Sequence, residues 1–289
     1  MRTRIKAQVV EALGVRADEL EWFPLAGGDT TLNFRVQING TVDWVVKTDA
    51  DRSGRRFATE RDGLDAIRRT QALRVPMVHT VSTDGQFIIL EAIRTRPMNQ
   101  GGWSALGAGL ARLHRFDVGM PYGWSTSNFI GPAVQHNECR TSWLEFWREF
   151  RLEPQVKRAV DGHAIGSRVG ALLTSVVDRL ENWIAARVQP SLLHGDLWSG
   201  NALMEANGQP VLIDPAVSVG DREADLAMTH MFGGFPAEFY RAYDASFERP
   251  QGWYDRVEIY TLYHWLNHLN CFGSQYVEPV RRIAMRYGS

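Results

Sequence analysis

The strongest constraint on the fold of this chain is the segment HGDLWSGN at residues 194–201, called the catalytic loop below. It places Asp196 five positions before Asn201, with two glycines in between or adjacent. In the protein-kinase loop H-R-D-x-x-x-x-N, this spacing lets the aspartate accept the proton of an attacking hydroxyl while the asparagine holds Mg²⁺. Asp and Asn are also common in plain turns, because their side chains hydrogen-bond nearby backbone. The segment alone therefore leaves a turn and a phosphoryl-transfer loop open.

A second carboxylate follows an apolar, strand-like run. Residues 211–213 are Val-Leu-Ile, and Asp214 comes directly after them and before a proline. In kinases, a carboxylate at such a strand end, close behind the Asp/Asn loop, binds the metal ion. The order Asp196, Asn201, strand, Asp214 favours the catalytic interpretation over the turn.

Composition excludes several classes of protein. The chain has 289 residues, a formal net charge of −1, 44% hydrophobic residues and 22% charged residues. A chain of this length can bury a large core and form two lobes, and a near-neutral charge gives no long-range attraction to nucleic acid or an anionic membrane. Apolar runs are too short to span a bilayer, no secretory signal is expected, and Cys139 and Cys271 suggest neither a disulfide framework nor a zinc site. We expect a cytoplasmic protein with a small-molecule substrate, and no nucleic-acid or membrane partner.

Lysine usage singles out one residue, Lys47. Only three of the 32 basic residues are lysines, and Lys47 closes an alternating run at residues 41–47 that predicts a strand. An ammonium group is a compact charge suited to bridging nucleotide phosphates, whereas the alternative is a solvated strand end. No lysine follows a glycine, so a Walker P-loop is excluded.

Two features around Lys47 fit phosphate binding. The pair Gly27 and Gly28 lies between extended segments, where a backbone without Cβ atoms can approach phosphate oxygens, although most such pairs are hairpin turns. A helix expected at residues 55–69 carries Glu60 on its apolar face. In a kinase-like lobe, this glutamate holds the lysine; the alternative is surface pairing with a neighbouring arginine.

Strand-like periodicity ends after residues 86–91, and most of the remaining chain is helical. We place a boundary there, between an N-terminal nucleotide-binding lobe at residues 1–93 and a C-terminal catalytic and substrate-binding lobe at residues 94–289. The backbone of Glu91, Ala92 and Ile93, which connect the lobes, is expected to hydrogen-bond an adenine. Helices are expected at residues 4–13, 102–115, 143–152, 168–186, 222–232, 237–247 and 253–271. The pattern predicts an α+β, two-lobed protein-kinase-like fold with a small β-rich N-lobe and a larger, mainly helical C-lobe.

Further polar residues lie in the helical part. Asp225, one turn into a helix that Asp221 is suited to cap, is expected to accept backbone N–H groups of the catalytic loop, with a solvated helix face as the alternative. His264 and His268 are four residues apart, but no further metal ligand accompanies them. We interpret both as core histidines among aromatic residues.

Four segments together resemble the fructosamine kinase (ketosamine 3-kinase) family, in the aminoglycoside-phosphotransferase branch of the protein-kinase-like fold. They are residues 193–201, 213–216, 220–227 and 232–235. The similarity extends over nearly the whole chain, and Trp-Ser-Gly in the catalytic loop separates it from choline and aminoglycoside kinases. The resemblance implies ATP-dependent phosphorylation of the 3-hydroxyl of a ketosamine, carried by a small molecule or by a glycated lysine of a protein. Breakdown of the product would release the amine, a deglycation reaction.

The resemblance also implies roles for individual residues. Asp196 would be the general base, Asn201 and Asp214 would hold Mg²⁺, and Lys47 and Glu60 would form the phosphate-positioning pair. Trp198 would pack against the sugar, and His194 would support the loop or the substrate.

This chain departs from the family in its glycine loop, which reads Gly-Gly-Asp-Thr-Thr with Thr30 and Thr31 where the family usually has Ile and then Asn or Ser. The loop also lacks the redox-sensitive cysteine of some relatives. Two alternatives stay open. One is a kinase of another small hydroxylated amine, of the choline or aminoglycoside type, and the other is a non-catalytic nucleotide-binding scaffold. The scaffold would be expected to lack at least one of Lys47, Asp196, Asn201 and Asp214, and all four are present.

Overall fold

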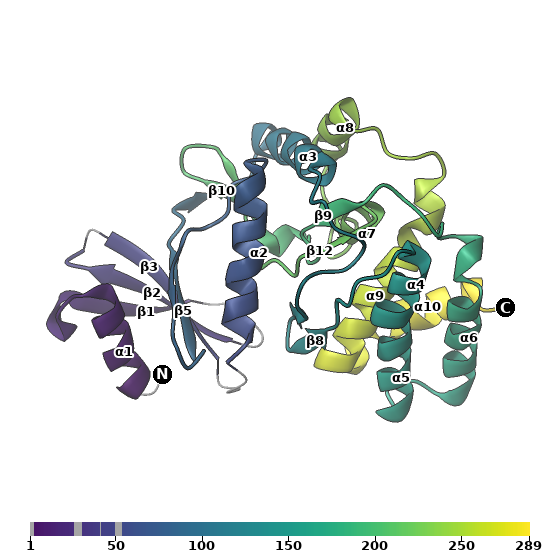
Figure 1. The fold of residues 1–289 in the computed structure, drawn as a ribbon, viewed down its shortest axis with the longest axis horizontal. Coiled ribbons are helices and arrows are strands. Elements are labelled where there is room, and N and C mark those ends of the chain that lie inside the picture. Colours follow the sequence, from purple (N-terminus) through teal and green to yellow (C-terminus); the bar gives the residue numbers. More distant parts are fainter. Residues whose placement is uncertain (1–2, 26–30, 41, 50–53) are drawn as a thin grey trace.

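The computed structural model describes residues 3–25, 31–40, 42–49 and 54–289. Gly27, Gly28 and Thr30 lie outside the described residues, so the predicted role of the glycine loop stays a prediction. A small antiparallel sheet precedes a larger, mainly helical part (Figure 1). The strand order in this sheet is β1-β2-β3-β5-β4. The strands are β1 (Leu20–Leu25), β2 (Thr31–Ile38), β3 (Val42–Asp49), β4 (Val78–Val81) and β5 (Phe87–Glu91).

The two faces of the sheet have different partners because side chains alternate along each strand. Val46 of β3 and Ile89 of β5 are fully buried on the face that packs against Val9 of helix α1 (Thr3–Leu13). The neighbouring Lys47 points to the opposite face, toward the helical part of the molecule. β3 continues to Asp49, so Lys47 lies within the strand and does not close it.

Helix α2 (Arg56–Thr70) confirms the helix expected after the lysine strand. Phe57, Leu64 and Ile67 are fully buried on its apolar face. They belong to a hydrophobic cluster that also contains Leu106 and Leu110 of α3 (Gln100–Arg115). One core therefore joins α2 to the helical part, and Figure 1 shows α2 between the sheet and that part.

The helical part contains most of the predicted helices, with different ends. The remaining helices are α4 (Trp143–Trp147), α5 (Glu153–Asp161), α6 (Ser167–Asp178), α7 (Glu223–Met228), α8 (Ala237–Ser246), α9 (Trp253–Phe272) and α10 (Val277–Tyr287). A π-helical turn, η2 (Arg148–Leu152), joins α4 to α5, so the chain stays helical past the predicted end at residue 152.

Two predicted helices were too long, and two helices were missed. α6 ends at Asp178, followed by the 3-10 turn η3 (Leu180–Asn182), although the prediction extended to residue 186. α7 ends at Met228 rather than at residue 232, and the chain then enters the left-handed region at Phe232 and at the two glycines after it. An L-residue in that region cannot continue a right-handed helix. α5 and α10 were not predicted.

Short strand pairs hold the catalytic loop. It lies between β9 (Ser191–Leu193), paired with β12 (Ser218–Gly220), and β10 (Ala202–Glu205), paired with β11 (Pro210–Leu212). A second hairpin consists of β7 (Asn128–Ile130) and β8 (Ala133–Gln135). β6 (Thr95–Arg96) pairs with β10. The lobe boundary between residues 93 and 94 stays a prediction. Within the described ranges, no helix is both long and apolar enough to cross a membrane.

Candidate active site

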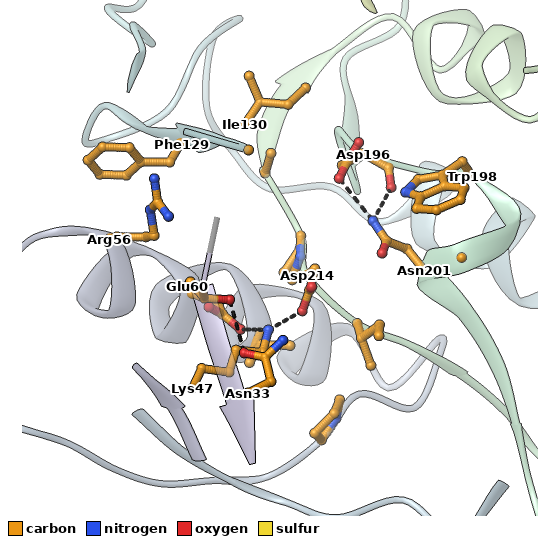
Figure 2. Close-up of a pocket in the computed structure, with 18 of the residues that line it drawn as sticks. Asn33, Lys47, Arg56, Glu60, Phe129, Ile130, Asp196, Trp198, Asn201 and Asp214 are labelled. Carbon is orange, nitrogen blue, oxygen red and sulfur yellow. Dashed lines mark hydrogen bonds and ion pairs between the residues drawn. The ribbon is translucent and has the colours of Figure 1, made fainter. Parts of the chain in front are cut away.

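A cavity of about 700 Å³ lies between the sheet and the helical part. Side chains from both parts line it, and Figure 2 shows them pointing toward a common space. The sequence-predicted residues in its wall are Lys47, Glu60, Glu91, Ile93, Asp196, Trp198, Asn201 and Asp214. His194 and Asp225 lie behind this wall, beneath the catalytic loop.

Lys47 is the centre of a charge cluster in the cavity. Its Nζ donates to Glu60 Oε1 at 2.6 Å and contacts Asp214 Oδ1 (Figure 2). The Lys47 residue is only 8% exposed. The alternatives of a solvated lysine and of a surface-paired Glu60 are therefore wrong.

The charged groups of this cluster shift one another's pKa values. Burial by itself would lower the pKa of Lys47, but the negative charges of Asp214 and Glu60 raise it above its ordinary value. Burial raises the pKa of Glu60, the Lys47 charge opposes this rise, and the Asp214 charge adds to it. Lys47 therefore has two carboxylate partners, and both line the cavity.

Glycine is required at position 195, where protein kinases carry arginine. Gly195 has a φ of +81°, and a Cβ at this position would lie 2.0 Å from the backbone oxygen of Ala216. The residue lets the catalytic loop turn tightly against the chain that follows Asp214.

The catalytic loop orients Asp196 through Asn201. The Nδ2 of Asn201 donates to the backbone oxygen of Asp196 at 2.8 Å and to its Oδ2 at 2.9 Å. Burial and the charge of Asp214 raise the pKa of Asp196 to about 7, although the hydrogen bond from Asn201 opposes the rise. A carboxylate with a pKa near neutrality is well matched to general-base catalysis.

The predicted hydrogen bonds from the catalytic loop to Asp225 are present. Asp225 accepts the backbone N–H groups of His194 at 2.7 Å and Gly195 at 2.8 Å. His114 of α3 was not singled out by the sequence, yet its Nε2 lies 3.2 Å from the same carboxylate. It is fully buried, and burial lowers its pKa, so the ring is neutral at pH 7.

His194 uses both ring nitrogens to support the loop. Its Nε2 lies 3.0 Å from the backbone oxygen of Ile213, and its Nδ1 lies 3.3 Å from the backbone nitrogen of Asp196. Only a neutral ring with its proton on Nε2 satisfies both contacts, since the first partner accepts and the second donates. Burial lowers the pKa of His194, which agrees with the neutral form.

The oxygen atoms of Asp214 and Asn201 fit a magnesium ion carried by a nucleotide. Both residues line the cavity, and the amide nitrogen of Asn201 is engaged with Asp196, which leaves its Oδ1 for a cation. Within the described part of the chain, no three His, Cys, Asp or Glu side chains form a metal-binding group. Mg²⁺ needs no such group, because it usually takes one or two carboxylates together with phosphate oxygens and water.

The segment connecting the lobes only partly fits the predicted contact with adenine. The backbone nitrogen of Glu91 donates to Met77 at 2.8 Å, and that of Ala92 donates to Asp43 at 3.4 Å. These two amides therefore already have backbone acceptors. Ile93 lines the cavity, and its amide has no backbone acceptor among the described residues. The contact of this segment with adenine stays a prediction.

An aromatic wall opposite the sheet was not predicted. Trp198 meets Phe232 with ring centroids 5.6 Å apart, and Phe232 meets His268 at 5.0 Å. His268 is half-buried and lines the cavity, so interpreting it as a core residue was wrong, whereas His264 is buried. Burial lowers the pKa of His264 to about 3. Phe232 has a left-handed φ of +53°, a backbone conformation that sequence spacing could not reveal.

The five-stranded sheet with its Lys–Glu pair and the helical lobe with its Asp/Asn loop define a protein-kinase-like phosphotransferase. The family model described as fructosamine kinase matches residues 1–287. This chain belongs to the fructosamine kinase family.

Individual relatives agree with this assignment. The chloroplastic protein-ribulosamine 3-kinase of Arabidopsis thaliana is 37% identical over 238 residues, which cover 80% of this chain and 72% of that protein. A provisionally named ketoamine kinase of Vibrio cholerae is 33% identical and covers 96% of this chain and 95% of its own. A structure from Thermobifida fusca, provisionally assigned as a fructosamine-3-kinase, matches with a TM-score of 0.86 and 29% identity over 99% of this chain and 100% of that one. An ADP-bound aminoglycoside phosphotransferase, 14% identical with a TM-score of 0.67 over 100% of this chain and 98% of that one, shares the fold.

Proposed function

We propose that this protein is an ATP-dependent kinase of ketosamines that acts on the 3-hydroxyl of the sugar. The observation that carries the proposal is the position of Asp196. Its pKa is raised to about 7, and it lies in the wall of the cavity that also contains the Lys47 cluster. The ketoamine and ribulosamine kinases among the relatives support the substrate class.

Different residues of this chain have different roles in the proposed reaction. Asp196 accepts the proton of the 3-hydroxyl as the oxygen forms a bond to the terminal phosphorus of ATP and the bond from that phosphorus to the bridging oxygen breaks. Lys47, held by Glu60, positions the phosphates. Asp214 and Asn201 would hold Mg²⁺, which would neutralise charge on the phosphates.

The product explains the role of such a kinase. A phosphate on the carbon next to the ketone makes the adduct unstable, and its breakdown releases the amine. The substrate is a free ketosamine or a glycated lysine of a protein, and its sugar would lie at the aromatic wall of the cavity, packed against Trp198.

Turnover of ATP with Mg²⁺ against a panel of acceptors tests the proposal. The panel contains ribulose-lysine, erythrulose-lysine, fructose-lysine, choline and kanamycin. We expect phosphorylation of at least one ketosamine and none of choline or kanamycin. Activity on choline or kanamycin alone would show a kinase of the choline or aminoglycoside type. ATP binding without turnover of any acceptor would favour a non-catalytic nucleotide-binding scaffold.

A further inference from the structure

Helix α2 is attached to the C-lobe on both sides of Glu60. One turn before Glu60, the guanidinium of Arg56 lies over the ring of Phe129 in β7, 5.5 Å from its centroid. One turn after it, Gly63 packs against the chain that follows Asp214. A Cβ at this glycine would lie 3.2 Å from Pro215 Cγ. The helix that holds Lys47 therefore also contacts the support of the metal-binding carboxylate.

The most directional of these attachments is a hydrogen bond between the lobes. The indole nitrogen of Trp124 donates to Asp62 Oδ2 at 2.6 Å. Trp124 is 7% exposed, and its backbone nitrogen donates to Asn137 at 2.8 Å. The preceding residue, Gly123, exchanges backbone hydrogen bonds of 2.9 and 2.7 Å with Val219 of β12. Trp124 is thus built into the C-lobe, and a bond to a charged acceptor fixes α2 relative to it.

These contacts connect the two halves of the active site. β12 follows Asp214 after three residues, and it anchors Trp124 through Gly123. Trp124 holds Asp62, which is two residues from Glu60 on the same helix. Glu60 in turn holds Lys47 at 2.6 Å. We propose that Asp62 and Trp124 are positioning residues that dock α2 on the C-lobe and so keep the Lys47–Glu60 pair assembled before nucleotide binds.

The proposal rests on the proposed kinase function, because it assigns Lys47 to the nucleotide phosphates. It implies that this kinase needs no activating event to bring its glutamate to its lysine. We call the Trp124–Asp62 hydrogen bond the clamp. Loss of the clamp lets α2 shift. This shift weakens ATP binding and slows phosphoryl transfer, whereas the contacts of the acceptor are unaffected.

Kinetics with varied ATP on clamp variants tests this inference. Trp124→Phe removes the indole donor and keeps the ring, and Asp62→Ala removes the acceptor. Each is expected to lower kcat/KM for ATP about tenfold, the size of effect typical for a hydrogen bond to a charged group. Asp62→Asn retains an acceptor oxygen and should stay within about twofold of wild type. The matched control is Asp65→Ala, which removes a carboxylate paired with Arg68 on the same helix.

A double-mutant cycle separates positioning from general stability. In a Glu60→Gln background, Asp62→Ala should add less than about twofold, because the clamp acts through the glutamate that is already disabled. Equal effects in both backgrounds, or wild-type kinetics in Asp62→Ala, would overturn the proposal.

ATP affinity measured by calorimetry without acceptor keeps the two hypotheses distinct. If no acceptor is phosphorylated, the proposed function fails, yet a weaker affinity for ATP in Asp62→Ala with a normal thermal melt would still support the clamp. An unchanged affinity in that variant would contradict it.

Discussion

At the scale of single residues, the proposed general base Asp196 depends on its charge. Asp196→Asn keeps the shape of the side chain but removes its basicity. We expect nucleotide binding to stay nearly intact while turnover falls by roughly 10²–10⁴-fold, the range for a positioned general base. Steady-state kinetics together with calorimetric titration of ATP checks both parts. Unchanged turnover would remove Asp196 from the mechanism.

The raised pKa of Asp196 also predicts a pH profile. Because its pKa lies near 7 in the folded protein, turnover should decline as pH falls below about 7 and the carboxylate becomes protonated. The pH dependence of kcat, measured at saturating ATP and Mg²⁺, checks this. A flat profile between pH 5 and pH 8 would contradict the assignment.

Stability should respond to the same group in the opposite direction. The folded-state pKa is above the ordinary value, so the protonated form is favoured by folding. The stability that the protonated form contributes is fully present below about pH 4 and is lost as pH rises through about 7. Asp196→Asn should therefore melt at a higher temperature than wild type at pH 8 and at a similar temperature at pH 4.

The proposed role of Lys47 in positioning the phosphates requires an ammonium group rather than any cation. Lys47→Arg keeps the charge, but a planar guanidinium is broader and cannot occupy the same point beside Glu60 and Asp214. We expect severe loss of activity, and a milder loss in Glu60→Gln. Kinetics with varied ATP tests both variants, and wild-type activity in Lys47→Arg with a normal thermal melt would remove Lys47 from the site.

Asp214 is the carboxylate through which the response to Mg²⁺ should pass. Asp214→Ala removes one of the two proposed protein ligands, so half-maximal activity should require more Mg²⁺. The measurement is turnover across a Mg²⁺ titration at fixed ATP. A titration curve that coincides with that of wild type would contradict the metal-binding role.

At the scale of elements, α7 braces the catalytic loop through a single carboxylate. Asp225→Ala would leave the buried backbone N–H groups of His194 and Gly195 without their acceptor, which should cost about 3 kcal/mol of unfolding free energy and lower kcat. Urea unfolding and kinetics measure the two effects. Asp178→Ala, on the exposed end of α6, is the matched control and should change neither.

The sign of the Asp225 pKa shift agrees with this bracing role. Burial alone would raise the pKa, but the hydrogen bond with His114 and the backbone N–H of Gly195 lower it below its ordinary value. A carboxylate with a lowered pKa stabilises the fold above its ordinary pKa of about 4, and this stability is lost as pH falls through the folded-state pKa.

At the scale of the whole molecule, the two lobes share a hydrophobic core. Phe57 and Ile67 of α2 belong to the same buried cluster as Leu106 and Leu110 of α3. A fragment of residues 94–289 would expose the surface that α2 covers. We expect it to lack a cooperative thermal transition, whereas the full chain should unfold in one. Calorimetry on both checks this, and a cooperative transition in the fragment would show that the C-lobe folds independently.

The sequence by itself determined the features that depend on local spacing. The offset between Asp196 and Asn201, the alternation that places Lys47 in a strand and the helical face that carries Glu60 are encoded within a few residues. The structure brings these residues into the wall of one cavity. Backbone periodicity governs such features whatever the rest of the chain does, so they can be predicted without the fold.

Only the tertiary structure decided the features that depend on distant segments. The amides of Glu91 and Ala92 are occupied by Met77 and Asp43, and Phe232, in a left-handed conformation, meets His268 in the cavity wall. The pKa of Asp196 follows from its burial and from the charge of Asp214 on the other side of a β-hairpin. Hydrogen-bond partners, burial and electrostatic interactions act through space, and the pattern of a single segment carries no record of which segments will become its neighbours.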